Sequence, residues 1–122
     1  MDVQHVAVVS YVSVVDSEDR EIRYPVGKYM SRSDALNALV SGNITQVVFR
    51  KKDSTITSRN VIAKAADQKC GSRYICAKDI HKIRLGLPAY INIKISGIIG
   101  VVTKGSMHII RETVEEEEAH GM

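Results

Sequence analysis

The sequence contains no tryptophan and a single phenylalanine, and aromatic residues make up only 5% of its 122 residues. Such a low aromatic content disfavours a surface that holds single-stranded nucleic acid by stacking bases on rings. Cys70 and Cys76 are five residues apart, which is not the spacing of a zinc knuckle, and no second Cys or His pair completes a site. No uncharged apolar run approaches the length that spans a bilayer. These absences exclude a zinc finger, a disulfide-stabilised mini-protein and a protein with membrane-spanning helices.

Recognisable catalytic motifs are missing as well. The four histidines are scattered, and none belongs to an H-x-E or H-E-x-x-H pair. There is no glycine-rich phosphate loop and no nucleophile elbow, and Asp53, Asp67 and Asp79 fall in separate turns. We therefore expect a protein that is not an enzyme, that has no metal site and that needs no cofactor.

The apolar content of 44% is sufficient for a folded core. Surface scaling for a chain of this length predicts that folding buries about two-thirds of the accessible surface. We expect one globular domain over residues 1–114 and an acidic, disordered tail over 115–122. No basic region of a secretory signal follows Met1, and the cysteines suit free thiols, so we expect a cytoplasmic, intracellular location.

The formal net charge of +3 is unevenly distributed along the chain. Residues 1–42 carry four Lys or Arg against six Asp or Glu, and residues 112–122 carry five Glu and nothing basic. Residues 43–111 carry thirteen Lys or Arg against three Asp, a net charge of +10. An excess of this size is typical of a surface that binds a polyanion.

Residues 31–42 carry the signals of one short helix. Ser31 or Ser33 can cap the first amide groups, and Gly42 can adopt the left-handed conformation that ends a helix. Asp34 is favourable at the positive end of the helix dipole. Apolar side chains recur at helical spacing, as in a helix that packs against a sheet; they are Ala35, Leu36, Leu39 and Val40.

The remaining segments are typical of short strands separated by turns. Pro25 and Gly27 predict that the second strand is an edge strand or a bent one. Residues 58–69 suit either a strand or a helix, of which we favour a strand with a short helical turn over 63–68. The predicted strands span residues 6–15, 21–29, 44–51, 55 onward, 73–77, 81–85, 90–95, 98–103 and 107–114. The predicted fold is α+β and mainly β, a small antiparallel barrel or curved sheet with one short packed helix at about 31–42.

A basic hairpin is predicted with Asp53 at its tip. Because side chains alternate on a strand, we expect Arg50 and Lys52 on one face and Phe49 and Lys51 on the other. Positive side chains along a hairpin can follow the phosphates of a nucleic acid, although they also protect a sheet edge from pairing. The candidate nucleic-acid-binding residues are Arg50, Lys51, Lys52, Arg59, Lys64, Arg73, Lys82 and Arg84.

Two further features bear on partners. Tyr74 and Tyr90 are candidates for stacking on bases, although such tyrosines more often pack on the rim of a core. Residues 91–107 are strongly β-prone and nearly uncharged, which suits central core strands or a homo-oligomer interface through strands in 90–107. Of these two, we favour the core.

About 55 residues, from Asp34 to about Leu87, follow a recognisable order: a helix ending at a glycine, a basic strand before a turn, an arginine on the return strand, and two later strands with basic residues. The matching positions are Gly42, Phe49, Lys51, Lys52, Asp53, Arg59, Arg73, Tyr74 and Arg84. This order resembles the Sm-like small β-barrel of WYL domains and their phage-encoded relatives.

A second likeness uses other positions. Gly27-Lys28 before the predicted helix, and Lys51-Lys52 before the segment 58–69, are similar in order to the βαβα core of Alba chromatin and RNA-binding proteins. A long helix over 63–69 would favour this likeness. Both resemblances imply nucleic-acid or nucleotide binding.

We therefore expect a small non-enzymatic protein that binds nucleic acid through a basic hairpin face, with the acidic tail as a spacer or an intramolecular competitor. One alternative is an oligomeric protein that binds a nucleotide or cyclic-nucleotide signal, as a phage-type inhibitor would. The other is an adaptor whose basic face meets an acidic protein. No membrane partner is expected.

Overall fold

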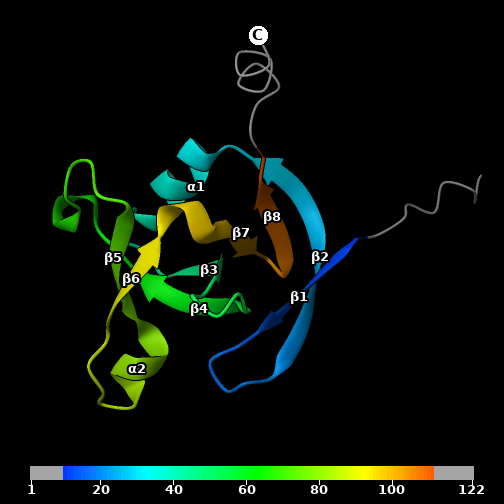
Figure 1. Cartoon of the computed structure of the whole chain (residues 1–122), viewed down its shortest axis with the longest axis horizontal. Coiled ribbons are helices and arrows are strands. Elements are labelled where there is room, and N and C mark those ends of the chain that lie inside the picture. The colour runs from blue at the N-terminus through cyan, green and yellow to red at the C-terminus, as the bar shows by residue number, and fades with distance from the viewer. Residues whose placement is uncertain (1–9, 112–122) are drawn as a thin grey trace, which may run out of the picture.

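The computed structural model describes residues 10–111 of the chain (Figure 1). Within that range the chain forms eight strands, two short α-helices and two single turns of 3-10 helix. The strands are β1 (Tyr11–Val15), β2 (Glu21–Met30), β3 (Thr45–Arg50), β4 (Ile56–Ile62), β5 (Tyr74–Asp79), β6 (Tyr90–Lys94), β7 (Ile98–Thr103) and β8 (Ser106–Ile110). The helices are α1 (Arg32–Leu39) and α2 (Ile80–Arg84), and the 3-10 turns are η2 (Ala65–Asp67) and η3 (Ile95–Gly97).

Six of the strands form a closed barrel in the order β1-β2-β8-β7-β3-β4, and β4 closes it by pairing with β1. The expected small barrel is thus confirmed, but its antiparallel character is only partly right. The pairs β1–β4 and β2–β8 are parallel, whereas the other pairs are antiparallel. At the closure the Thr57 hydroxyl donates a hydrogen bond to the carbonyl oxygen of Val15.

The β5–β6 hairpin lies outside this barrel and extends the sheet from the far end of β4 (Figure 1). One edge of β4 is therefore shared between two neighbours. Thr57, near its start, pairs with β1, whereas Val61 and Ile62, at its end, pair with β5. Strands β1 and β5 diverge from each other between Thr57 and Val61 of β4, so the β5–β6 hairpin lies beside the barrel wall.

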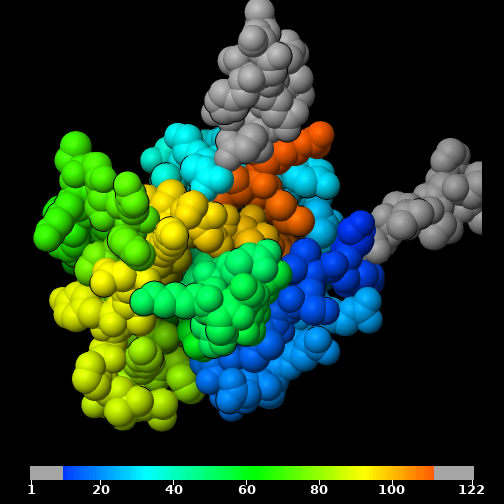
Figure 2. Space-filling view, in the orientation of Figure 1, coloured from blue at the N-terminus to red at the C-terminus, as the bar shows by residue number. Residues whose placement is uncertain are grey.

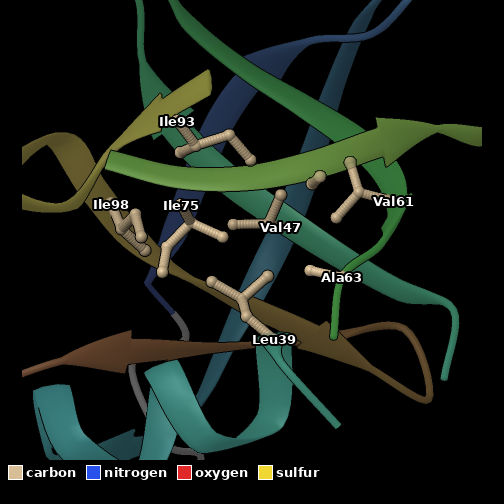
Figure 3. Close-up of a cluster of buried hydrophobic side chains, with 8 residues drawn as sticks. Leu39, Val47, Val61, Ala63, Ile75, Ile93 and Ile98 are labelled. Carbon is tan, nitrogen blue, oxygen red and sulfur yellow. The ribbon is translucent and has the colours of Figure 1, made fainter. Parts of the chain in front are cut away.

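The core has two parts, because β3 is buried on both faces: Val47 and Val48 are each fully buried but belong to different clusters. The cluster around Val48 draws on all six barrel strands and fills the barrel. The cluster around Val47 joins the outer face of the barrel to α1 and the β5–β6 hairpin (Figure 3). Its core members are Leu39, Val47, Val61, Ala63, Ile75, Ala77, Ile93 and Ile98. The segment 91–107 accordingly supplies core strands, as favoured from its composition.

Helix α1 begins as its sequence predicts. The Ser31 hydroxyl oxygen accepts a hydrogen bond from the backbone N–H of Asp34 at 3.0 Å. The helix ends at Leu39, earlier than expected, and Gly42 then has a φ of +87°, in the left-handed region that favours glycine. Its one fully inserted large side chain, Leu39, packs into the outer cluster.

One expectation about strands is wrong, and another is settled in favour of one of its two alternatives. Residues 81–85 do not form a strand: Ile80–Arg84 is the helix α2, because the Asp79 carboxylate accepts hydrogen bonds from the N–H groups of His81 and Lys82 at 2.9 and 3.3 Å. Of the two alternatives for the second strand, the bent strand is right and the edge strand is not, since β2 pairs with both β1 and β8. It is bent, with a register shift between Val26 and Tyr29.

The segment 58–69 continues as strand to Ile62, and its only helical part is the three-residue turn η2, as favoured. The long helix that would have supported the Alba likeness is not there. The expectations for residues 6–9, for 112–114 and for the acidic tail at 115–122 lie outside the described residues. Among the helices of residues 10–111, none is both long and apolar enough to span a membrane.

Candidate functional site

A hollow of about 610 Å³, here called the basic hollow, lies between the β3–β4 turn and the β5–β6 hairpin. In Figure 2 the green residues of the turn stand beside the yellow residues of β6. Four positively charged side chains line the hollow, and none of its described lining residues carries a carboxylate. The lining consists of Phe49, Arg50, Lys51, Lys52, Ser54, Tyr74, Asn92, Lys94, Ser96 and Gly97.

The β3–β4 turn brings three of these cations together. Strand β3 ends at Arg50, and the N–H of Lys51 then donates to the Thr55 carbonyl at 2.9 Å, while the N–H of Ser54 donates to the Lys51 carbonyl at 2.9 Å. The strand alternation expected over residues 49–52 therefore stops at Arg50. Instead of lying on two faces, Arg50, Lys51 and Lys52 line the same hollow.

The carboxylate of Asp53 is held within the turn. Its Oδ1 accepts a hydrogen bond from the Thr55 N–H at 2.9 Å. This bond is the main reason that the pKa of Asp53 lies below its usual value, and the nearby Lys51 lowers the pKa further. The turn thus carries one negative charge, but this charge is tied to the turn backbone and is not part of the hollow's lining.

The floor of the hollow is fixed by close packing of η3 against the end of β3. A Cβ placed on Gly97 would lie 3.2 Å from the carbonyl oxygen of Arg50, tighter than most real contacts of this kind. A side chain at this position would require η3 or the end of β3 to shift by a few tenths of an ångström. The glycine therefore allows the close contact between η3 and β3.

The β5–β6 hairpin presents a polar outer face to the hollow. The register pairs Tyr74 with Lys94, Cys76 with Asn92 and Lys78 with Tyr90, so these six side chains share one face. The opposite face, which includes Ile75 and Ile93, is buried in the outer cluster.

A second hollow, of about 430 Å³, adjoins the first, because Lys94 and Ser96 line both. It adds two arginines, Arg32 from α1 and Arg73 from the loop before β5. The Arg32 guanidinium donates from Nη1 to the carbonyl oxygen of Ile95 at 3.0 Å, which links α1 to η3. We call the cations of the two hollows the basic surface: Arg32, Arg50, Lys51, Lys52, Arg73 and Lys94.

The structure therefore brings four of the eight candidate binding residues together: Arg50, Lys51, Lys52 and Arg73. The other four lie elsewhere. Arg59 forms an ion pair with Asp79, with Nε 3.7 Å from Oδ2. Lys64 precedes η2 on the exposed surface, and Lys82 and Arg84 belong to α2.

Sequence reasoning missed Arg32 and Lys94. Lys94 had a usable signal, since Tyr90, Asn92 and Lys94 share a face of a strand that was predicted. Which strand lies beside that face depends on the β5–β6 register, which the sequence does not specify. Arg32 lies in the predicted helix, and its place beside η3 depends on how that helix packs.

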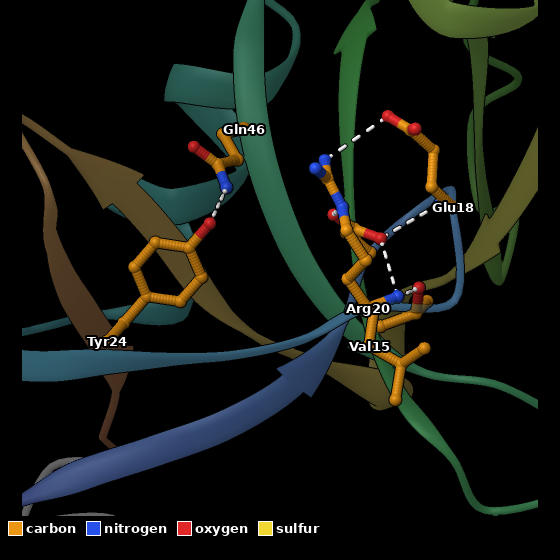
Figure 4. Close-up of polar contacts among 7 residues, drawn as sticks. Val15, Glu18, Arg20, Tyr24 and Gln46 are labelled. Atoms are coloured by element: carbon orange, nitrogen blue, oxygen red, sulfur yellow. Dashed lines mark hydrogen bonds and ion pairs between the residues drawn. The ribbon is translucent and has the colours of Figure 1, made fainter.

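A third pocket, of about 350 Å³, opens where β4 turns from β1 to β5, between the β1–β2 turn and α2. Both signs of charge line it, including Asp16, Glu18, Arg20 and Arg84. Arg20 is already paired, with Nε 2.9 Å from Asp16 Oδ2 and Nη2 3.2 Å from Glu18 Oε1 (Figure 4). This mixture suits a polyanion less well than the basic surface does.

Polar contacts also order the neighbourhood of this third pocket. The Gln46 side-chain amide donates to the Tyr24 hydroxyl at 2.6 Å (Figure 4). The Arg20 backbone N–H donates to Asp16, and this is the largest cause of the lowered pKa of Asp16. Among residues 10–111 no group of three or more His, Cys, Asp or Glu side chains is arranged to hold a metal ion.

Comparisons with known proteins return nothing: no protein-family model matches the chain, and no curated protein or solved structure matches it.

Proposed function

We propose that this protein binds nucleic acid through the basic surface between the β3–β4 turn and the β5–β6 hairpin. The observation that carries the proposal is the basic hollow, in which four cationic side chains line one concavity and no carboxylate belongs to the described lining. Cations gathered in this way repel one another, and a row of phosphates would relieve that repulsion.

The chemistry of the lining suits a nucleic-acid backbone. Arg50 offers a planar fork that can bind a phosphate through two hydrogen bonds, whereas Lys51 and Lys52 act as point charges on flexible stems. Asn92 and Ser96 add uncharged hydrogen-bonding groups. The second hollow extends this surface toward Arg73, so that a chain of phosphates can be followed rather than a single one.

The proposal is tested by measuring fluorescence anisotropy of labelled oligonucleotides over a series of salt concentrations. We expect the affinity to fall steeply with salt, because each phosphate contact releases counterions. The variant Lys51→Gln/Lys52→Gln should bind more weakly and lower the slope of log affinity against log salt by about 1.5, which corresponds to two lost contacts.

The matched control is Lys28→Gln/Lys104→Gln, which removes two exposed lysines that line none of the three hollows. The control should keep the wild-type slope. Absence of binding at low salt, a flat salt dependence, or an equal effect of both double variants would each refute the proposal.

A free nucleotide is the second candidate ligand, because about 610 Å³ lies within the range of small-ligand sites. A thermal-shift series with mononucleotides separates the two candidates. A mononucleotide that raises the melting temperature as much as an oligonucleotide does at the same concentration would favour the small ligand, since a ligand of the folded state, at free concentration L, stabilises it by RT ln(1 + L/Kd).

A further inference from the structure

Two tyrosines are exposed on the outer face of the β5–β6 hairpin, beside the basic hollow. Tyr74 is 45% exposed and Tyr90 is 69% exposed, although large apolar side chains usually gain from burial. Tyr74 lines the hollow and lies directly opposite Lys94 in the register. Tyr90 lies at the other end of the same face, with the Nζ of Lys78 5.1 Å from its ring centre.

The spacing of the two rings leaves each of them available to a separate partner. They are four residues apart along the hairpin and on neighbouring strands, which corresponds to roughly 14 Å between their Cα positions. At that distance the rings do not stack on each other. Each instead offers a flat apolar surface close to a cation, Lys94 for Tyr74 and Lys78 for Tyr90.

We infer that the basic surface selects single-stranded nucleic acid, with Tyr74 and Tyr90 stacking on unpaired bases while the neighbouring cations hold the phosphates. This inference rests on the proposed function and names its substrate class. In a duplex the bases are already stacked inside the helix, so only phosphate contacts would remain. A single strand can place its bases on the rings and its backbone in the basic hollow at the same time.

The low aromatic content of the whole chain disfavours a stacking surface on composition alone, but the positions of the rings outweigh it. Stacking needs rings near the place where the phosphates are bound: Tyr74 lines the basic hollow, and Tyr90 lies on the same face of the β5–β6 hairpin. Two other tyrosines among residues 10–111 are exposed: Tyr11, which is 52% exposed, and Tyr29, which is 58% exposed. They lie on β1 and β2, not on the face of the β5–β6 hairpin that carries Tyr74 and Tyr90, and an arginine covers each ring.

Tyr11 and Tyr29 therefore provide matched controls. The experiment compares binding of a mixed-sequence single-stranded DNA, the same sequence as RNA, and the DNA duplex, all by anisotropy at one salt concentration. Tyr74→Ala and Tyr90→Ala should each weaken binding of both single strands by about 5- to 100-fold and change duplex binding less than twofold. Tyr74→Phe and Tyr90→Phe, which keep the ring, should bind single strands as the wild type does, and so should Tyr11→Ala and Tyr29→Ala.

Two further measurements make the result decisive. The salt slope of the alanine variants should equal that of the wild type, because stacking releases no counterions. The chain has no tryptophan, so tyrosine emission reports on the rings directly: single strands should quench it in the wild type and quench it less in Tyr74→Ala/Tyr90→Ala. Circular dichroism melting of each variant establishes that it is folded.

The outcomes distinguish this inference from the proposed function. If no oligonucleotide binds, the proposed function itself is wrong. If single strands and duplex bind alike, with a steep salt dependence that the tyrosine variants share, the basic surface binds phosphates and only the inference is wrong. The inference is supported if either single strand binds more tightly than the duplex and this preference is lost in Tyr74→Ala and Tyr90→Ala.

Discussion

The guanidinium Nε of Arg59 lies 3.7 Å from the Oδ2 of Asp79, while the Oδ1 of the same carboxylate accepts the backbone N–H groups that begin α2. The Asp79 side chain is only 2% exposed, so one nearly buried carboxylate both caps a helix and neutralises an arginine on β4. Arg59 lines neither hollow of the basic surface. Its charge is paired with Asp79 where β4 of the barrel meets β5 of the hairpin.

Replacing Asp79 should destabilise this junction. Asp79→Ala removes the cap and leaves Arg59 without its carboxylate, so we expect the free energy of unfolding to fall by about 2–3 kcal/mol. Asp79→Asn retains an oxygen that can cap α2 and should cost about half as much. Urea unfolding followed by circular dichroism measures both. Equal losses in the two variants would mean that the charge, and not the cap, dominates.

Replacing Lys94 should weaken nucleic-acid binding without changing stability, whereas replacing Arg59 should lower stability without changing binding. Lys94→Gln removes a cation that lines both hollows, so we expect weaker nucleic-acid binding and a salt slope lower by about 0.8, with an unchanged melting temperature. Arg59→Gln should leave the slope unchanged and lower stability by about 1–2 kcal/mol, between the values for exposed and buried pairs. Salt titrations and thermal melts of the two variants check this. A reversed pattern would place the binding surface on the Arg59 side of β4.

Helix α1 and the β3–β4 hairpin are predictable because local residues determine them. The Ser31 cap, Gly42 and the turn around Asp53 lie within or next to the elements that they define. Helix α2 is different: five residues are too few to show a helical period, and His81, Ile83 and Leu85 alternate as in a strand. What decides it is the preceding Asp79 cap.

The parallel pairs β1–β4 and β2–β8 could not be predicted for another reason. Each joins strands that are far apart in the sequence, and no turn residue specifies their register. The site shows the same division. The cluster Arg50, Lys51 and Lys52 is local and was found, whereas the contribution of Lys94 depends on the packing of a distant hairpin.

Leu39 links α1 to the sheet, and its truncation should be costly. The side chain is fully buried in the outer cluster beside Val47 and Val61 (Figure 3). Leu39→Ala would leave a cavity there, and we expect a loss of about 3 kcal/mol. Ile44→Ala, at a residue 60% exposed, is the control and should cost less than about 0.5 kcal/mol. Comparable losses in denaturant unfolding would contradict the packing of α1.

Gly100 allows β7 and β8 to approach closely. A Cβ at this position would lie 2.1 Å from the carbonyl oxygen of His108, a clash with backbone that no rotamer can relieve. We expect Gly100→Ala to lower the free energy of unfolding by about 3 kcal/mol or more, the upper end for overpacking. Gly105→Ala is the comparison, since Gly105 has open space around it but a φ of +80°, and it should cost about 1–2 kcal/mol. If Gly100→Ala were the milder change, the close β7–β8 contact would be wrong.

The carboxylates of Asp16 and Asp53 should make stability depend on pH in acid. The backbone N–H of Arg20 is the largest cause of the lowered pKa of Asp16, and the N–H of Thr55 has the same role for Asp53. Because each folded-state pKa lies below the unfolded value, each carboxylate stabilises the fold above the unfolded pKa. This contribution is lost as the pH falls through the folded pKa.

We therefore expect the free energy of unfolding to decline between about pH 5 and pH 2. Asp16→Asn/Asp53→Asn keeps an acceptor oxygen at both turns and removes the titration, so its decline should be shallower. Urea unfolding at a series of pH values measures the decline, and NMR titration of the two carboxyl groups measures each pKa directly. A variant that declines as steeply as the wild type would assign the acid sensitivity to other carboxylates.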